Sequence, residues 1–154
     1  VFIHGGSFTG GSINEMQFNG SAYTKRGVIF IAINYRLNVF GFFADGVHCK
    51  GNLGLYDQYT AIEWIRHNVS AFGGDPENIT LFGQSGGASS VDNMCALPAS
   101  RGLIQKAIMQ SGGGIRPVYS YWSESLDHAK EAGVEFLKVL GVSSIEEARK
   151  AKEA

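Results

Sequence analysis

Cysteine, charged side chains and long apolar runs are scarce in this sequence, and each shortage excludes a class of protein. Two cysteines in 154 residues are too few for a disulfide framework, and they lack the spacing of a zinc site. Charged residues make up only 18% of the chain and the net charge is −1, which argues against binding to nucleic acid or to an anionic membrane. No apolar run reaches the ~18 residues of a membrane-spanning helix. No pattern in the sequence predicts a metal ion or an organic cofactor.

Glycine, by contrast, is abundant. The 21 glycines are about twice the usual ~7% share, and with only three prolines and no repeat they indicate many tight turns. Hydrophobic residues make up 44% of the chain, enough for the core of one globular domain. The chain starts at Val1, without a methionine and inside an apolar segment, so we expect it to be part of a longer protein. Sequons at Asn19, Asn68 and Asn78 matter only in a secreted protein, so cytoplasmic and secreted locations both stay open, as does the oligomeric state.

The strongest chemical signal lies in residues 79–88, which read as a short strand, a turn holding a serine, and the start of a helix. The segment 83–87, GQSGG, fits the G-x-S-x-G nucleophile elbow. A serine on such a tight turn stands clear of the backbone, and glycine two residues to either side avoids collisions with the neighbouring strand and helix. The pentapeptide alone also fits an ordinary strand-to-helix turn, so the rest of the chain decides between the two interpretations.

The order of elements predicts an α/β fold. Apolar runs at 1–3, 28–35, 79–82 and 106–112 are typical of strands, and 28–35 has the continuous pattern of a strand covered on both faces. Helices are predicted over 53–72, 86–96 and 123–140, with a last helix opening at Ser144 and Glu147 as a capping box. The first of these helices carries an apolar stripe: Leu55, Tyr59, Ile62, Ile65, Val69 and Phe72. Alternating strands and helices predict a mainly parallel sheet with helices on both faces.

Two further segments bear on function. Residues 4–8, HGGSF, form a glycine-rich loop after the first strand. Such a loop lets backbone N–H groups point into a cavity. An ordinary glycine turn without a functional role is equally compatible with this sequence. The aromatic residues Tyr119, Tyr121 and Trp122 either line a pocket or pack against the body of the domain. Arg36 follows the second strand, and we expect it to be buried and paired with Asp57 or Asp45, in a structural role in preference to a contact with substrate.

Five segments resemble the type-B carboxylesterase and cholinesterase group of α/β-hydrolases. They are FIHGGSF at 2–8, INYRLNVFGF at 33–42, GNLGLYDQ at 51–58, FGGDPENITLFGQSGGASSV at 72–91 and LPASRGLIQKAIMQSG at 97–112. They run in the family's order and cover nearly everything before about residue 115. The resemblance implies an incomplete α/β-hydrolase fold: residues 1–154 as one partial domain, a fragment that lacks the first strands and the C-terminal part.

The resemblance also implies an activity, the hydrolysis of small-molecule carboxylic esters without a cofactor. Ser85 would be the nucleophile of an acyl-enzyme mechanism. Backbone N–H groups of Gly6, Ser7 and Gly86 would form the oxyanion hole. Phe8 would lie near the acyl pocket, Ser111 would lie near the catalytic triad, and Arg36 with Asp57 would be structural.

The chain departs from the family pattern in four respects, of which the smallest is Gly86, where the family usually has alanine after the nucleophile and the backbone N–H is unchanged. Ser7 replaces the third glycine of the loop, which leaves the backbone donor in place. Gln84 replaces the glutamate before the nucleophile, so a choline-like cationic alcohol is not favoured. The acid and histidine of the triad follow the serine in this fold and are expected beyond residue 154.

The histidines within the chain are a less favoured source of the base. His128, with Asp92 or Glu124 as its acid, falls on the polar side of a predicted helix, and we expect all four histidines to be structural. The segment alone is therefore expected to be inactive. The alternative function is a catalytically inactive truncated, or adhesion-type, member of the same fold.

Overall fold

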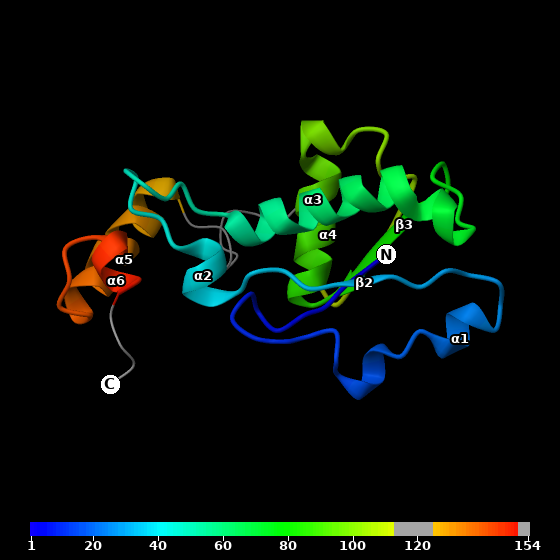
Figure 1. Cartoon of the computed structure of the whole chain (residues 1–154), viewed down its shortest axis with the longest axis horizontal. Helices are drawn as coiled ribbons and strands as arrows, with labels where there is room; N and C mark the ends of the chain where they lie inside the picture. Colours follow the sequence, from blue (N-terminus) through cyan, green and yellow to red (C-terminus); the bar gives the residue numbers. More distant parts are fainter. Residues whose placement is uncertain (113–124, 151–154) are drawn as a thin grey trace.

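Four parallel strands form the sheet at the centre of the chain (Figure 1). The structure, a computed structural model, describes residues 1–112 and 125–150, so the aromatic residues predicted around 119–122 lie outside the described residues. The strands are β1 (Phe2–Ile3), β2 (Ala32–Ile33), β3 (Thr80–Gln84) and β4 (Lys106–Gln110), in the order β2-β1-β3-β4. Every pair is parallel, which confirms the predicted α/β class.

The helix predicted over 86–96 has the predicted bounds, whereas those predicted over 53–72 and 123–140 are shorter. The helices are α1 (Ser21–Thr24), α2 (Asn38–Phe42), α3 (Leu53–Asn68), α4 (Gly86–Ala96), α5 (Leu126–Val139) and α6 (Ile145–Ala148), with 3-10 turns η1 (Met16–Phe18), η2 (Val69–Phe72) and η3 (Pro98–Ser100). The predicted helix over 53–72 becomes a 3-10 turn after Asn68, and Gly73 ends it at φ 80°. The predicted capping box of α6 forms in part: the Ser144 hydroxyl accepts a hydrogen bond from the Glu147 N–H at 3.2 Å, but the Glu147 carboxylate accepts from the N–H of Ser143, at 2.8 Å, and not from that of Ser144.

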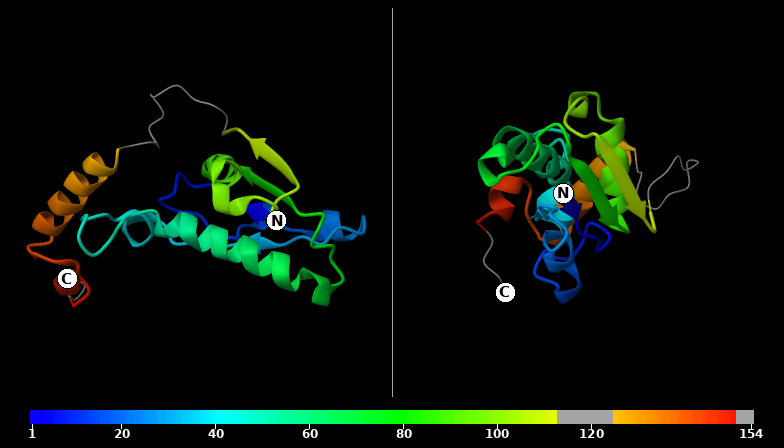
Figure 2. Two further views of the ribbon diagram at one scale, coloured as in Figure 1. Left: turned by 90° about the horizontal axis from the view of Figure 1, so that it is seen from above. Right: turned by 90° about the vertical axis from the view of Figure 1, so that its right-hand side faces the viewer.

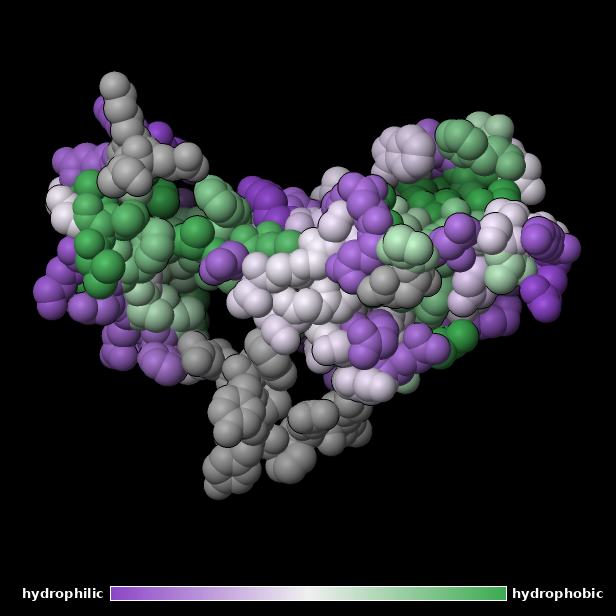
Figure 3. Space-filling model, turned by 90° about the horizontal axis from the view of Figure 1, so that it is seen from below, coloured by the Kyte–Doolittle hydropathy of each residue, from purple (hydrophilic) through white to green (hydrophobic). Residues whose placement is uncertain are grey.

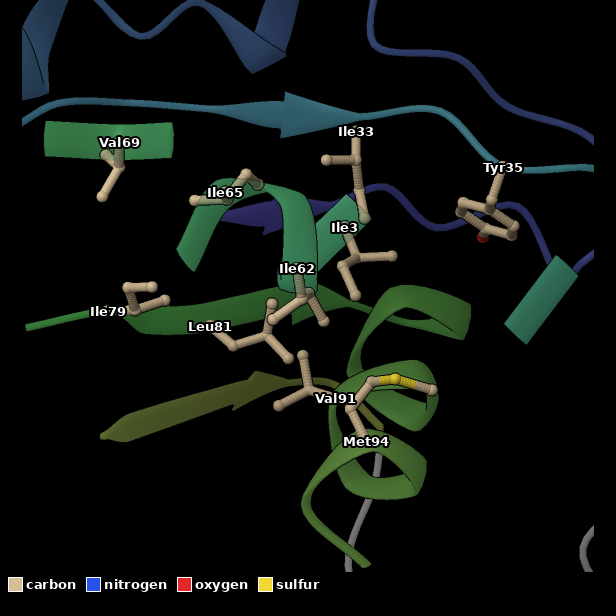
Figure 4. Packing of buried hydrophobic residues seen from close by; sticks show 10 residues of the cluster. All are labelled: Ile3, Ile33, Tyr35, Ile62, Ile65, Val69, Ile79, Leu81, Val91 and Met94. Atoms are coloured by element: carbon tan, nitrogen blue, oxygen red, sulfur yellow. The ribbon is translucent and has the colours of Figure 1, made fainter. Parts of the chain in front are cut away.

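One face of the sheet holds an aliphatic core. Side chains alternate along a strand, so Ile3 of β1 lies with Ile33 and Leu81 on this face. Helices α3 and α4 cover it, with Ile62 and Val91 meeting in the same cluster (Figure 4). Helices α3 and α4 are thereby packed on the two strands, β1 and β3, that carry the predicted site.

The other face of the sheet is aromatic. The ring of Phe2 lies 4.7 Å from that of Phe18 and 5.0 Å from that of Phe82, and Tyr23 stacks on Phe30 at 5.2 Å, all between ring centroids. Within the described part of the chain, α1 and η1 are the helical segments near these rings, so this face has a thinner layer than the first.

Two predicted apolar segments are less buried than expected. The strand predicted over 28–35 is wrong in length: only Ala32–Ile33 pair with the sheet, and Val28 is 50% exposed. The reason is that β1, the only neighbour of β2 within the described sheet, offers just two residues for pairing. Phe72 ends the predicted apolar stripe of α3 but is 68% exposed, because it falls on the 3-10 turn where the helical spacing is lost.

Helices α5 and α6 lie at one end of an elongated molecule (Figure 2). Gly133 of α5 packs directly on the Ala44 backbone, and the Phe136 ring meets Phe43 edge-on at 6.1 Å. Hydrophobic surface is visible at both ends of the molecule (Figure 3). Within the described residues, no helix combines the length and apolarity that a membrane crossing requires.

Candidate active site

The predicted site lies at the carboxyl ends of β1 and β3. These strands are neighbours, with Ile3 opposite Gly83 in the register. The glycine-rich loop leaves β1 at His4, and the predicted elbow leaves β3 at Ser85. Because parallel strands end at the same edge of a sheet, two segments about eighty residues apart in sequence lie side by side.

Ser85 occupies a strained turn between β3 and α4. Its backbone angles are φ 55° and ψ −120°, outside the regions that non-glycine residues usually adopt, at a typical cost of ~1–3 kcal/mol. Its N–H donates to the Gln110 carbonyl at 2.8 Å, and its carbonyl accepts from the Ser89 N–H at 3.1 Å. The turn is thus held by β4 on one side and by the first turn of α4 on the other.

The glycines around Ser85 are required by close backbone contacts, as the motif predicts. A Cβ atom on Gly83 would lie 2.4 Å from the Gly87 carbonyl oxygen. A Cβ atom on Gly87 would lie 2.1 Å from the Ile3 carbonyl oxygen. Both distances are shorter than any real Cβ contact, so α4 can approach β3 and β1 this closely only with glycine at these positions.

The glycine-rich loop folds tightly against the elbow. Gly6, Ser7 and Phe8 have consecutive positive φ angles of 107°, 56° and 61°. The N–H groups of the next two residues both donate to the Gly6 carbonyl at 3.0 Å, which closes the loop. A Cβ on Gly86 would lie only 3.2 Å from the Ser7 nitrogen, so the loop backbone touches the residue after the predicted nucleophile.

Three backbone N–H groups near Ser85 have no hydrogen-bond acceptor among the described residues. Among residues 1–112 and 125–150, no group accepts a hydrogen bond from the N–H of Gly6, Ser7 or Gly86. Gly86 is also the first residue of α4, where N–H groups lack helical partners and the helix dipole favours negative charge. The structure therefore brings the four predicted site residues together, and this arrangement suits an oxygen atom that gains negative charge.

Tyr35 and His4 pack together at the start of the glycine-rich loop. The Tyr35 hydroxyl donates to the His4 carbonyl at 3.0 Å, and the two rings stack with centroids 4.6 Å apart. The His4 ring is buried, with Nδ1 2.8 Å from the Gly5 carbonyl oxygen. Burial raises the pKa of Tyr35 to about 12, so its hydroxyl stays protonated and able to donate. No motif in the sequence points to Tyr35; its position at the end of an apolar segment is the only signal for it.

A hollow of about 530 Å³ opens beside the loop. Its lining comes from the loop, from the segment that follows it and from the residue before Ser85: Gly5, Gly6, Thr9, Gly10, Gly11, Glu15, Phe18 and Gln84. The Gln84 side chain is exposed here and carries no charge. Phe8 is not in this lining; its ring packs edge-on against Phe42 at 5.2 Å.

The described histidines make no hydrogen bond to the Ser85 hydroxyl. His48 pairs with Asp45, with 3.5 Å between Nδ1 and Oδ2, and His67 lies in the last turn of α3. His128 lies in α5, away from α4 in Figure 1. The described residues thus provide a serine and backbone N–H donors without a described acceptor, but no histidine that is hydrogen-bonded to that serine. They also hold no group of three or more His, Cys, Asp or Glu side chains suited to a metal ion.

Arg36 pairs with Asp57, the first of its two predicted partners. Nη2 lies 2.6 Å from Oδ1 and Nε lies 2.7 Å from Oδ2, a two-pronged pair that joins the end of β2 to α3. The hydrogen bonds from Arg36 lower the pKa of Asp57. The prediction that Arg36 is buried is wrong, because its side chain is 49% exposed. Asp45 instead accepts N–H groups of its own loop, which leaves it no part in this pair.

Comparison with known proteins identifies relatives of this chain. A family model described as "Carboxylesterase family" matches residues 1–148. The chain is 42% identical over 147 residues to para-nitrobenzyl esterase of Bacillus subtilis (strain 168), covering 93% of the chain and 29% of that protein. It is 47% identical over 125 residues to mouse neuroligin-2, covering 80% of the chain and 14% of that protein.

Solved structures agree with the sequence relatives. The fold matches a carboxylesterase of Geobacillus stearothermophilus with a TM-score of 0.84 and 41% identity, over 92% of this chain and 31% of that one. A thermophilic PNB esterase matches with a TM-score of 0.77 and 40% identity, over 92% of this chain and 29% of that one. The chain therefore spans less than a third of the length of these relatives.

Proposed function

The chain belongs to the carboxylesterase family, and on that premise we propose that it carries the nucleophile and the oxyanion hole of a serine carboxylesterase. Ser85 Oγ attacks the ester carbonyl carbon, and the carbonyl oxygen becomes an oxyanion. The N–H groups of Gly6, Ser7 and Gly86 stabilise that oxyanion. A general base takes the Ser85 hydroxyl proton during the attack and gives it to the leaving oxygen as the intermediate collapses, so the alcohol departs and an acyl-enzyme remains, which water then hydrolyses.

The observation that carries this proposal is a serine with strained backbone angles that lies beside backbone N–H groups without a described acceptor. Ser85 keeps an unfavourable backbone conformation directly beside three N–H groups that no described residue uses. An ordinary strand-to-helix turn needs neither feature, because a residue with relaxed angles connects the two elements at lower cost. Removing one oxyanion donor typically costs about 10²–10³ in kcat, so such donors have a large effect on the rate.

We assign the general base and its acid to parts of the protein outside residues 1–154. In α/β-hydrolases both groups follow the nucleophile in chain order, and this chain spans less than a third of its relatives. Residues 1–154 are accordingly proposed as a partial domain that is inactive by itself. The full-length protein is the active species.

The proposed substrate is a small carboxylic ester that reacts at Ser85 and extends toward the hollow beside the loop, whose lining includes Gln84 but not Ser85 itself. Gln84 borders this hollow next to Ser85, and its amide adds no negative charge. A cationic alcohol group therefore gains no attraction from this position, and a neutral alcohol group suits it better.

A fluorophosphonate probe tests the proposal, because it reacts with serine nucleophiles that have an oxyanion hole. We expect the full-length protein to be labelled and Ser85→Ala to abolish both labelling and ester hydrolysis. Ser89→Ala, one turn along the same helix, is the matched control and retains both. A folded full-length protein that takes no label would instead support the inactive or adhesion-type alternative.

A further inference from the structure

A buried polar contact lies directly beneath the elbow. Gln58 of α3 and Ser90 of α4 are both completely buried, at the packed contact between these helices. Gln58 Nε2 donates to Ser90 Oγ at 3.0 Å, and Ser90 Oγ donates to the Gly86 carbonyl at 3.0 Å. The two bonds form a chain that starts on α3 and ends on a residue of the proposed oxyanion hole.

This chain of hydrogen bonds restricts the first turn of α4. A serine hydroxyl has one hydrogen and rotates freely unless its partners fix it. Because Gln58 occupies a lone pair of Ser90 Oγ, the hydroxyl hydrogen is left for the Gly86 carbonyl. Gly86 has no side chain that could restrain its backbone. The hydrogen bond to its carbonyl therefore fixes the peptide unit between Gly86 and Gly87.

Gln58 is poorly suited to a purely structural role. Its Oε1 atom is buried and finds no partner among the described residues, which is unfavourable for stability. Its position four residues before Ile62 and three after Leu55 places it on the apolar side of α3, where a side chain such as methionine would fill similar space without a buried orphan. A polar group kept at such a place calls for an explanation other than packing.

We propose that Gln58 is a positioning residue of the oxyanion hole. Acting through Ser90, it holds Gly86 in the orientation in which the Gly86 N–H meets the developing oxyanion. This inference rests on the proposed function and names a residue on which that function depends. Gln58 itself touches neither substrate nor Ser85 in this role.

The test measures activity and stability together in the full-length protein, with p-nitrophenyl acetate as substrate. We expect Gln58→Met to lower kcat about tenfold with little change in KM, equivalent to ~1.4 kcal/mol of transition-state stabilisation. The Tm should not fall, since the variant removes a buried orphan. Fluorophosphonate labelling of Ser85 should slow in parallel. A normal kcat with a lowered Tm would show that Gln58 is merely structural and overturn the proposal.

Ser90→Ala provides a second route if Gln58→Met does not fold. It should lower kcat to a similar extent, and the double variant should be no worse than either single one, because both break the same chain. Ile62→Val, one turn along α3, is the packing control: it should lower Tm and leave kcat unchanged. Full activity of Ser90→Ala, or additive losses in the double variant, would overturn the proposal.

Failure of this inference differs from failure of the proposed function. A wild-type protein that takes no fluorophosphonate label fails at the level of the nucleophile and overturns both. A labelled, active wild type whose Gln58 and Ser90 variants keep normal kcat overturns only the role of Gln58.

Discussion

The backbone of Ser85 concentrates strain at a single residue. Its angles of φ 55° and ψ −120° are accessible to glycine at no steric cost, whereas a side chain makes them unfavourable. A serine at such a position implies that the function of its hydroxyl group outweighs the loss of folding free energy caused by the strain. Under the proposed function, Ser85 is thus a site where activity is gained at the expense of stability.

Replacing Ser85 by glycine separates the two effects. We expect Ser85→Gly in the full-length protein to be inactive but more stable than Ser85→Ala, by about 1 kcal/mol, because glycine relieves the strain and alanine keeps it. Equilibrium unfolding in urea measures the difference between the two inactive variants. Equal or lower stability of Ser85→Gly would show that the turn is not strained in solution.

Residue-scale features of the site were partly accessible from the sequence. The need for glycine at 83 and 87 is local, since the collisions involve backbone next to the motif, and the pattern predicted it. Tyr35 and Gln58 were missed because their partners, His4 and Ser90, lie 31 and 32 residues away in sequence. For Gln58 a signal existed, a polar residue within the apolar stripe of α3.

At the level of elements, the Arg36–Asp57 pair joins the segment after β2 to α3. It holds α3, which carries Gln58, against the strand edge where the site forms. The hydrogen bonds and charge of Arg36 favour the ionised carboxylate, so the pKa of Asp57 in the folded protein lies below its ordinary value of 3.8. A group with a depressed pKa stabilises the fold above its unfolded pKa, and the effect is lost as the pH falls through the folded value.

Asp57→Asn should therefore lower the Tm at neutral pH, and the difference from wild type should shrink as the pH falls below 3.8. Thermal unfolding of both proteins between pH 7 and the acid limit measures it. Glu63→Gln, also on α3, is the control for a general loss of negative charge. A difference between Asp57→Asn and wild type that stays constant down to the lowest pH would contradict the assigned cause.

The strands show where sequence patterns stop being informative. The run at 28–35 predicts a strand correctly in type and place, but pairing requires a partner of equal length, and β1 pairs through two residues. All residues of β4 are exposed although its sequence is apolar in the middle. Periodicity reports which residues prefer burial, whereas their burial depends on segments that lie elsewhere.

For the whole molecule, the short strand pairing leaves an exposed apolar groove of about 550 Å³ near the amino-terminal ends of the strands. Val28, Ile29 and Ile108 belong to its lining and are 40–50% exposed. Apolar surface gathered in this way favours association with other apolar surfaces. Residues 1–154 by themselves are thus expected to bind hydrophobic dyes and to self-associate.

Lysine at two of these positions should weaken both effects. We expect Ile29→Lys with Ile108→Lys, made in residues 1–154, to bind less anilinonaphthalene sulfonate and to sediment with a larger monomer fraction. Val47→Lys is the control, because Val47 is 76% exposed on a loop outside the groove. Unchanged dye binding in the double variant would show that the groove is not the surface responsible.

The pairing of β1 with β3 also sets an order in time. At about 5–20 residues per second during synthesis, the elbow follows the glycine-rich loop by roughly 4–16 seconds. During that interval the loop lacks its contacts with Gln84 and Gly86, which are not yet made. Strand β4, whose Gln110 carbonyl accepts the Ser85 N–H, is made later still. Contacts between distant segments form slowly because their intervening chain must first be closed. The glycine-rich loop at residues 4–8 is therefore made well before the segments that give it its final shape.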